Sequence, residues 1–380
     1  MRLAANWLTH RGTTAVFDAL DGHGAWFVGG CVRDGLLDRA VVDIDICTDA
    51  HPETVMERAG AAGLKTVPTG LQHGTVTVVA HGMGFEVTTL RRDLETDGRH
   101  ATVAFTADMA QDAARRDFTM NALYATRDGT VLDPNGSGLD DLRAGRVRFI
   151  GDASARIAED YLRILRFFRF HAWYADPDGG IDAEALAACA VGAGGLVQVS
   201  RERVGAEIIR LLRAPDPAPA VAAMDHAGVL AAVLPGASSR PLPLLLAMEG
   251  DRPPDAIRRL AAIGGEDVAD RLRLSRAETG QLALYRAEMA AATTPGALGY
   301  RHGADAALDI VILRAMLFEQ PPVALDIAAA QAGARAVFPI KAADLMPGLS
   351  GPALGARLSA LESAWIDSGF ALSKADLLSL

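Results

Sequence analysis

The sequence predicts an α+β domain at the N-terminus, with a small mixed sheet and helices, followed by an all-α region. Two observations predict this class. Short runs rich in Val, Ile and aromatic residues, which favour β-strands, are confined to roughly the first 145 residues. Beyond residue 154, alanine and leucine recur with helical periodicity. The chain has 380 residues, half of them hydrophobic, which is enough for more than one domain with a buried core.

The N-terminal domain is expected to alternate short strands with helices. The strands are expected at residues 26–28, 41–46, 74–79, 85–90 and 131–134. The helices are expected at residues 1–24, 32–37, 52–62 and 110–122. The polar, glycine-containing segment 91–107 is expected to be a mobile loop.

Proline-rich breaks divide the helical region, but they do not separate it into independent globular domains. We find no repeat of fixed period. We expect four segments, a head, a helical neck, a helical body and a helical tail, at residues 1–148, 149–214, 215–334 and 335–380.

The composition predicts a protein inside the cell. No run approaches the ~18 apolar residues of a membrane-spanning helix. The N-terminal segment lacks the apolar stretch and cleavage site of a signal peptide. We therefore expect a cytoplasmic protein with no membrane partner. The three cysteines, Cys31, Cys47 and Cys189, show no CxxC spacing, which argues against a disulfide framework and against a zinc site.

The charge leaves a nucleic-acid partner open. A net charge of −10 does not favour one, because phosphate binding depends on basic side chains. A local basic face would suffice, however, and almost all the cations are arginines, which suit bidentate contacts to phosphates and base edges. The alternative is a compositional bias towards arginine.

Two aspartates, Asp43 and Asp45, lie one residue apart in the apolar run 41–46. Alternate side chains of a strand share a face, so both carboxylates should project the same way, roughly 7 Å apart along the backbone. Such a pair favours a hard divalent cation such as Mg²⁺, which takes oxygen ligands and often retains nucleotide phosphates. Metal-dependent phosphoryl or nucleotidyl transfer is the chemistry this indicates. A third carboxylate is often useful at such a metal site, and Glu86 is the candidate. The alternative is that Glu86 is simply an exposed acid on a strand.

A glycine turn, Gly29 and Gly30, precedes the aspartates and opens a short helix that carries Arg33. Glycines let the backbone approach a phosphate closely, and a helix start offers free N–H groups. Arg33 is expected to reach a triphosphate. A Gly-Gly turn alone is weak evidence for a phosphate-binding site. A Gly-Gly turn followed by Arg-Asp and then Asp-x-Asp is much stronger evidence.

A third constellation lies at residues 115–123. Arg116, Asp117 and Asn121 could face one region of a helix, because residues 117 and 121 are four apart. They offer a cation and partners for ribose hydroxyls. The alternative is a charged helix start that packs through apolar neighbours.

The fourth constellation places Asp160, Arg163, Arg166 and Arg169 three residues apart on a helix that is otherwise largely apolar. The polar stripe should therefore line a cleft. A carboxylate only accepts hydrogen bonds and a guanidinium only donates them. An Asp160–Arg163 edge would match the amino donor and ring-nitrogen acceptor of cytosine and adenine. Guanine and uracil present the reverse order, and such pairing can discriminate by about 10⁴ or more.

In this order, the motifs Gly-Gly-x-Val-Arg-Asp, Asp-x-Asp, Arg-Arg-Asp-Phe-Thr-x-Asn-Ala and Glu-Asp-x-x-Arg-x-x-Arg resemble the class II tRNA nucleotidyltransferases and poly(A) polymerases. The resemblance covers residues ~25–215. It implies a catalytic head with Mg²⁺ held by Asp43 and Asp45, and a neck that reads the base. The residues it places at the nucleotide are Gly30, Arg33, Arg116, Asp117, Asp160, Arg163, Arg166 and Arg169, with Gly29, Glu86 and Asn121 as further candidates.

The resemblance implies addition of C, C and A from CTP and ATP to the 3′ end of tRNA, with release of pyrophosphate, by a two-metal mechanism. The alternatives are a bacterial poly(A) polymerase and relatives that add only CC or only A. The chain ends without a basic extension, which favours CCA addition. The loop at residues 91–105 would be the family's flexible loop, with residues 95–100 coupling the switch from C to A. The segment 200–207 would be a structural neck motif. No protein partner is implied.

Overall fold

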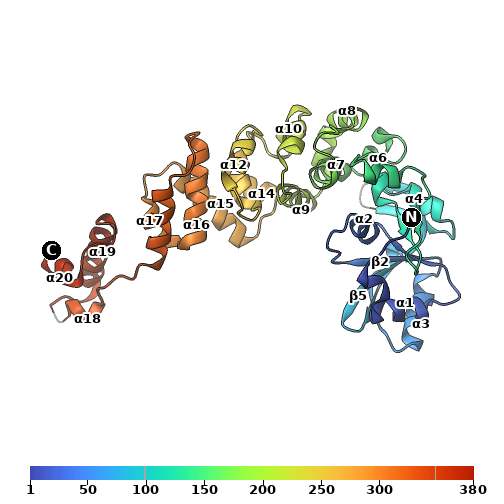
Figure 1. Ribbon diagram of the computed structural model, residues 1–380, viewed down its shortest axis with the longest axis horizontal. Helices are drawn as coiled ribbons and strands as arrows, with labels where there is room; N and C mark the ends of the chain where they lie inside the picture. Colours follow the sequence, from blue (N-terminus) through green and yellow to red (C-terminus); the bar gives the residue numbers. More distant parts are fainter. Residues whose placement is uncertain (98–99, 347) are drawn as a thin grey trace. The chain divides into compact units, whose positions relative to one another are not determined.

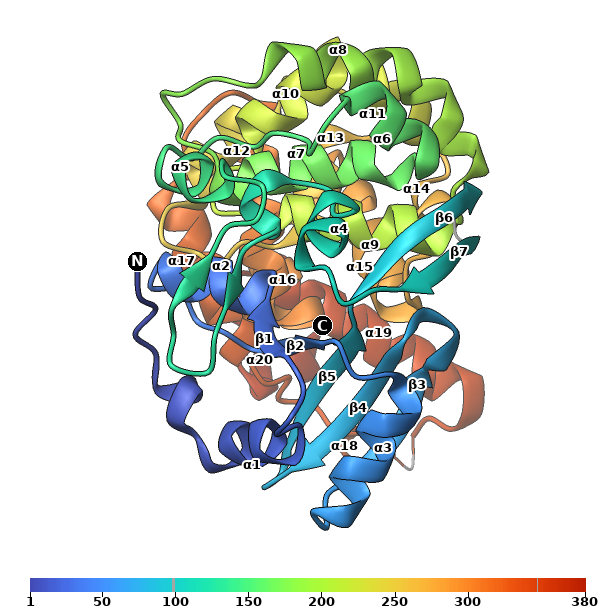
Figure 2. The same ribbon diagram turned by 90° about the vertical axis from the view of Figure 1, so that its right-hand side faces the viewer.

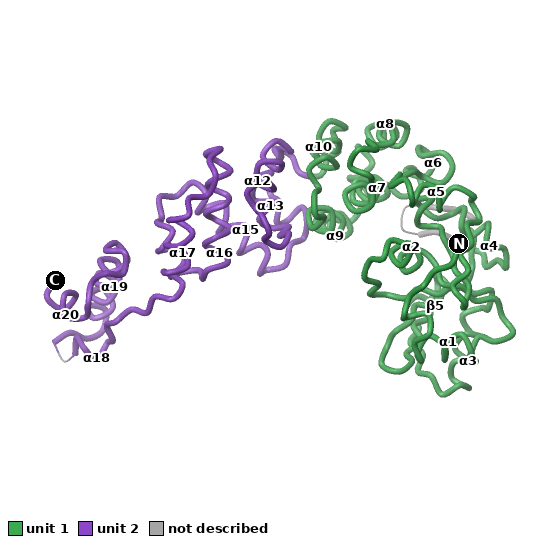
Figure 3. The backbone as a smooth tube through the Cα atoms, in the orientation of Figure 1, with its two compact units in different colours: residues 1–233 green, residues 234–380 purple. Residues whose placement is uncertain are grey.

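A computed structural model describes residues 1–97, 100–346 and 348–380. Within it the chain forms two compact units, Met1–Val233 and Leu234–Leu380, drawn in different colours in Figure 3. The first unit holds a mixed sheet and the helices that follow it, and the second is helical (Figure 1). The predicted fold class, an α+β head followed by all-α segments, is confirmed. The four segment boundaries stay a prediction.

A seven-stranded sheet organises the head, in the order β3-β4-β5-β2-β1-β8-β9. Strands β2 and β5 are parallel, and the other neighbours are antiparallel. The strands are β1 (Ala25–Val28), β2 (Ile44–Thr48), β3 (Lys65–Gly70), β4 (Thr75–Ala80), β5 (Met83–Thr89), β8 (Tyr124–Ala125) and β9 (Val131–Leu132).

One face of the sheet is closed by helices α1 (Arg11–Ala19) and α3 (Pro52–Ala61), which pack on β4 and β5 (Figure 2). Side chains of this face are buried, among them Ile46 and Phe85. Because strand side chains alternate, Asp45 and Glu86 project from the opposite face. The hydrophobic burial that fixes the sheet therefore also decides which face carries the carboxylates.

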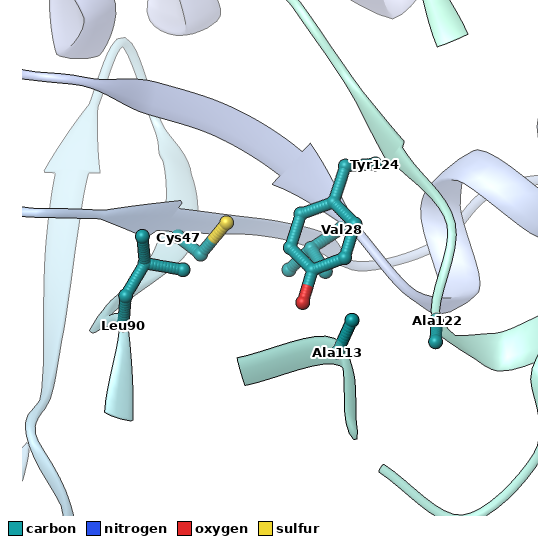
Figure 4. Packing of buried hydrophobic residues seen from close by; sticks show 6 residues of the cluster. All are labelled: Val28, Cys47, Leu90, Ala113, Ala122 and Tyr124. Carbon is teal, nitrogen blue, oxygen red and sulfur yellow. The ribbon is translucent and has the colours of Figure 1, made fainter. Parts of the chain in front are cut away.

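A smaller apolar cluster lies on the side of the sheet that carries Cys47. It contains Val28, Cys47, Leu90, Ala113, Ala122 and Tyr124 (Figure 4). This cluster joins β1 and β2 to α4 (Met109–Ala114) and β8. It anchors the segment that follows α4, which carries several of the predicted site residues.

The first predicted elements differ from the structure at their ends. Helix α1 is shorter than the expected helix 1–24 and follows a 3₁₀ helix, η1 (Asn6–Thr9). Strand β2 begins at Ile44 rather than at residue 41, because pairing with β5 begins there. Asp43 therefore directly precedes the strand.

The expected helix 110–122 and the expected loop 91–107 are both wrong. Helix α4 ends at Ala114, and a separate 3₁₀ turn, η3 (Thr119–Asn121), follows. Phe118 between them is fully buried and pairs with Phe149 through the backbone, so tertiary pairing overrides local helix propensity. The segment expected as a loop forms a hairpin of β6 (Arg91–Asp97) and β7 (His100–Phe105). Strand β3 was not expected; it lies at the sheet edge, where its proline is tolerated.

Helices complete the first unit. They are α2 (Gly30–Leu36), α5 (Gly138–Arg143), α6 (Ala153–Glu159), α7 (Leu162–Tyr174), α8 (Ala183–Gly192), α9 (Arg201–Leu212), α10 (Ala218–His226) and α11 (Val229–Val233). Helix α7 buries Ile164, Leu165, Phe167 and Phe168, and it packs against α9. The pairing of α7 with α9 positions the polar stripe of the neck.

The second unit consists of helices α12 (Leu242–Glu249), α13 (Ala256–Ile263), α14 (Val268–Arg271), α15 (Arg276–Met289), α16 (Pro295–Leu317), α17 (Ala324–Arg335), α18 (Ala342–Leu345), α19 (Gly351–Asp367) and α20 (Lys374–Ser379). A buried ionic network holds α12, α13 and α16 together: Arg258 donates to Glu249 and Asp309, at 2.9 and 2.7 Å. None of the helices in the described ranges is long and apolar enough to cross a membrane.

Candidate active site

The glycine turn lies against the segment that follows α4. Gly29 has φ 71° and ψ −123°, a conformation that favours glycine. A side chain here would lie 3.5 Å from Arg116 Nη1 and 3.7 Å from the carbonyl oxygen of Asn121. Gly29 therefore lets the first turn of α2 approach two of the predicted nucleotide-binding residues closely.

Two carboxylates, those of Asp45 and Glu86, share the open face of the sheet, and Asp43 directly precedes β2. Asp45 on β2 is paired in register with Glu86 on the parallel strand β5. Burial, together with repulsion from Glu86 and Asp43, raises the pKa of Asp45 from 3.8 to about 6, although Arg116 acts to lower it. The prediction that Asp43 and Asp45 hold a divalent cation, with Glu86 as a third carboxylate, stays a prediction.

The donor set fits a hard divalent cation. Within the described ranges, no three acidic, histidine or cysteine side chains are grouped so that they alone could hold a metal ion. Mg²⁺ is usually bound through one or two carboxylates, with water and substrate phosphates as its remaining ligands. Asp43 and Asp45 could supply such a pair, and a bound cation would relieve the repulsion that raises the pKa of Asp45.

A buried aspartate, Asp112, positions Arg116. Its carboxylate accepts hydrogen bonds from Arg116 Nη2 at 2.9 Å, from Arg115 Nε at 2.8 Å and from the Tyr124 hydroxyl at 2.7 Å. Burial alone would raise the pKa of Asp112, but the two arginines hold it well below its ordinary value. Burial acts to lower the pKa of Arg116, but Tyr124 and Asp112 raise it, so that this residue keeps its charge beside Asp45.

Asp112 and Tyr124 were not predicted as site residues. Asp112 lies four residues before Arg116 on the last turn of α4, a spacing that brings side chains together on a helix. That spacing could have indicated the contact. Tyr124 carried no comparable signal, because its hydroxyl reaches Asp112 from a separate strand, β8.

Asp117 connects this segment to the neck. One carboxylate oxygen accepts from the Asn121 side-chain amide at 3.1 Å, and the other accepts from Arg166 Nε at 2.7 Å. Burial would raise the pKa of Asp117, but Arg166, Asn121 and the backbone N–H of Phe118 lower it to about 2. Asp117 and Asn121 meet as expected, although the segment is not helical.

The helix expected across Asp160 and Arg163 is interrupted, and the use of these two residues to read a base stays a prediction. Helix α6 ends at Glu159, and α7 begins at Leu162. Asp160 accepts a hydrogen bond from Arg203 Nη2 at 2.6 Å. Arg163 pairs with Glu159 and donates to the carbonyl oxygen of Arg156 at 2.8 Å. The four-residue spacing of Glu159 and Arg163 could have indicated their contact, whereas the partner of Asp160 lies on another helix and left no such signal.

Arg166 and Arg169 face α9, where Glu207 is their acceptor. Glu207 is 3 % exposed and accepts from Arg169 Nε at 2.5 Å. Its second carboxylate oxygen lies 3.9 Å from Arg166. The segment 200–207, expected to be structural, thus supplies Arg203 and Glu207 as direct partners of the polar stripe. Their four-residue spacing on one helix is the signal that could have identified them.

Arg33 is buried inside the first unit. It donates to Asn121 Oδ1 and to the Tyr174 hydroxyl, both at 2.8 Å, and it pairs with Asp34. Gly30 adjoins it, since a side chain there would lie 3.7 Å from Arg33 Nη2. Arg33 therefore lies beside the glycine turn, but most of its guanidinium N–H groups donate to other groups of the protein.

Among the loop residues expected to couple C addition to A addition, Gly98 and Arg99 lie outside the described residues. The backbone of the hairpin on either side of them is paired from Arg91–Phe105 to Asp97–His100.

Parts of the chain are similar to known protein families and to known proteins. Residues 25–148 match the poly(A) polymerase head domain, and residues 180–240 match the family described as the probable RNA and SrmB-binding site of polymerase A. The human mitochondrial CCA tRNA nucleotidyltransferase 1 is 45% identical over 193 residues, which cover 50% of this chain and 44% of that protein. The CCA-adding enzyme of Leuconostoc citreum is 48% identical over 153 residues, which cover 40% and 37%. The aligned part thus spans less than half the length of these relatives.

Solved structures agree over a greater length. The crystal structure of the Bacillus stearothermophilus CCA-adding enzyme in complex with CTP has a TM-score of 0.76 and 28% identity, and the match covers 94% of this chain and 92% of that one. The Thermotoga maritima CCA-adding enzyme complexed with tRNA shares the fold, with a TM-score of 0.67 and 18% identity over 97% of this chain and 98% of that one. The chain is therefore similar to poly(A) polymerases in its head domain and to CCA-adding enzymes in its fold.

Proposed function

We propose that this protein is a template-independent nucleotidyltransferase that adds C, C and A from CTP and ATP to the 3′ end of tRNA and releases pyrophosphate. The observation that carries the proposal is the arrangement of Asp45 and Glu86 on the open face of the sheet, beside the glycine turn and Arg116. Relatives that are 45–48% identical in the aligned part are named as CCA-adding enzymes, which supports the same substrates here.

The metal-binding residues would be Asp43 and Asp45, with Glu86 as the neighbouring acid. When bound, Mg²⁺ would neutralise phosphate charge and lower the pKa of the attacking 3′-hydroxyl. Gly29 and Gly30 would admit the triphosphate, because their backbone has no side chain in the way. Arg116, held by Asp112, would supply a fixed positive charge beside the phosphates.

Base choice would belong to Asp160 and Arg163. The carboxylate of Asp160 would accept from the exocyclic amino group of cytosine or adenine, and Arg163 would donate to the adjacent ring nitrogen. In the structure, Arg203 and Glu159 are the partners of these two side chains. Base atoms would add to these partners, and a mismatched base would leave buried polar groups unpaired.

The remaining roles follow the position of each residue. Asp117 and Asn121 would contact the sugar region, and Arg166 and Arg169 would lie at the nucleotide or its phosphates. The head (1–148) would be catalytic, the neck (149–214) would recognise the base, and the tail (335–380) would contribute to tRNA binding beyond the body (215–334). We propose a cytoplasmic location, while noting that relatives include mitochondrial proteins.

A tRNA transcript that ends directly before CCA tests the proposal. With Mg²⁺, we expect two additions from CTP alone, three additions from CTP and ATP together, and no further extension. A long adenylate tail from ATP would indicate a poly(A) polymerase, and a stop after CC or dependence on a CC end would indicate the partial relatives. Asp43→Asn should abolish incorporation, whereas Asp21→Asn, at an exposed acid of the same unit, should not.

A further inference from the structure

A closed circuit of polar contacts joins the two ends of helix α7 through the head. Arg166, near the start of α7, donates to Asp117 at 2.7 Å, and Asp117 accepts from Asn121 at 3.1 Å. Asn121 accepts from Arg33 Nη1 at 2.8 Å. Arg33 Nη2 then donates at 2.8 Å to the hydroxyl of Tyr174, the last residue of α7. The circuit begins and ends on the helix that carries Arg163 and passes beside the glycine turn.

Arg33 is the rigid member of this circuit. Its Nε and Nη2 both donate to Asp34, at 2.9 Å each. Together with Asn121 and Tyr174, these bonds occupy four of the five N–H donors of a guanidinium. The side chain is 8% exposed. Arg33 therefore presents a fixed positive charge at the glycine turn, while most of its hydrogen-bonding capacity holds the protein together.

Tyr174 is the residue on α7 that receives Arg33. The Arg33 guanidinium carbon lies 4.2 Å from the centre of the Tyr174 ring and 5.1 Å from that of Phe170. Arg39, from the segment after α2, lies 4.8 Å from the same Tyr174 ring and donates to the carbonyl oxygen of Trp173 at 2.8 Å. Cations over an aromatic face are attracted by its quadrupole. Tyr174 thus holds Arg33 both through its hydroxyl and through its ring.

We propose that Tyr174 is a positioning residue for the nucleotide site, which acts by holding Arg33 and so fixes the glycine turn relative to the base-reading helix α7. The inference rests on the proposed function, in which the triphosphate binds at the turn and the base binds at the start of α7. A nucleotide then has to satisfy both places at once. Loosening the link at Tyr174 weakens the binding of every nucleotide alike, because Asp160 and Arg163 themselves are untouched.

Steady-state kinetics with CTP and ATP on tRNA lacking its terminal nucleotides test this role. Tyr174→Phe removes the hydroxyl and keeps the ring. Loss of one hydrogen bond predicts a KM for each nucleotide raised by about 5-fold, with kcat changed less than 2-fold and the preference for CTP over UTP retained. Tyr174→Leu, which also removes the ring, should raise KM further. Tyr300→Phe in the second unit, which also loses a tyrosine hydrogen bond, to Glu362, is the matched control and should leave KM unchanged.

A double-mutant cycle separates positioning from a general structural effect. If Tyr174 acts through Arg33, the double variant Arg33→Gln/Tyr174→Phe binds nucleotide no more weakly than Arg33→Gln alone. Effects on KM that multiply would overturn the proposal, as would an unchanged KM in Tyr174→Phe.

Amide hydrogen exchange without nucleotide provides a test that is independent of activity. We expect residues 30–36 of α2 to exchange faster in Tyr174→Phe than in the wild type, and to be unaffected in Tyr300→Phe. If the wild type incorporates no nucleotide, the proposed function fails, and the exchange of α2 still decides whether Tyr174 holds Arg33. Unchanged exchange of α2 in Tyr174→Phe would refute the link.

Discussion

Removing Arg166 should destabilise the first unit far more than removing an arginine from an exposed ion pair. The Asp117 carboxylate is only 7% exposed, and Arg166 donates to it at 2.7 Å. In Arg166→Met, burial that raises the Asp117 pKa would no longer be opposed by this guanidinium. Breaking a buried pair by removing one partner typically costs about 3–5 kcal/mol.

The pKa of Asp117 gives a second route to the magnitude. A fall from 3.8 to about 2 corresponds to about 2.4 kcal/mol, at about 1.36 kcal/mol for each pKa unit. Because the folded-state pKa is depressed, this stabilisation is fully present above about pH 4 and is lost as the pH falls through about 2. Arg166 is the first of the groups that lower this pKa, so its removal should eliminate most of the contribution.

The assay is hydrogen exchange of the amides of residues 117–125, which reports the stability of the first unit separately from that of the second. At pH 7 we expect Arg166→Met to lower the free energy of unfolding of the first unit by at least about 2 kcal/mol. The decrease should be smaller at pH 4, where the now unpaired Asp117 is more readily protonated. Arg143→Gln removes a cation from an exposed pair with Asp140, with side chains 57% and 72% exposed, and should cost about 1 kcal/mol or less. Equal losses in the two variants would refute the reasoning.

Three other changes test separate parts of the site. Asp112→Asn should raise the KM for CTP about tenfold, because Arg116 loses its ionic partner; steady-state kinetics measure this, and an unchanged KM would contradict the role of Asp112. Glu86→Gln should lower the pKa of Asp45 from about 6 towards its ordinary value in metal-free protein, because Glu86 raises that pKa. NMR of the carboxyl groups measures the pKa, and an unchanged value would show that Glu86 does not act on Asp45. Arg203→Met should reduce the preference for CTP over UTP by about tenfold, because the Asp160 carboxylate loses the donor at 2.6 Å that orients it. The effect should be smaller than that of removing Asp160 itself. An unchanged preference would show that Arg203 is dispensable.

The sequence predicted those parts of the site that depend on short-range pattern. The alternation around Asp45 placed it on the face opposite the buried Ile46, as the structure has it. The pairing of Asp45 with Glu86 could only be guessed, because the parallel neighbours β2 and β5 are separated along the chain by α3, β3 and β4. Long-range strand register leaves no local signal.

The incorrect predictions share a physical cause. Residues 110–122 have helical character, but the buried pairing of Phe118 with Phe149 interrupts the helix. Asp160 and Arg163 were expected on one helix, but α6 ends at Glu159 and α7 begins at Leu162. Asp160 pairs with Arg203, which lies on a different helix. Tyr174 and Tyr124 were missed because their contacts depend on how helices and strands meet, which spacing along the chain does not reveal.

The choice of base by Asp160 and Arg163 is the central claim, and the ratio of kcat/KM for CTP to that for UTP tests it most directly. On tRNA ending before CCA, we expect the wild type to prefer CTP by about 10⁴ or more, because uracil leaves buried donors and acceptors unpaired. Asp160→Ala should reduce this ratio to below about 100 while incorporation continues. If Asp160→Ala incorporates CTP and still rejects UTP as strongly as the wild type, the account of base selection is wrong.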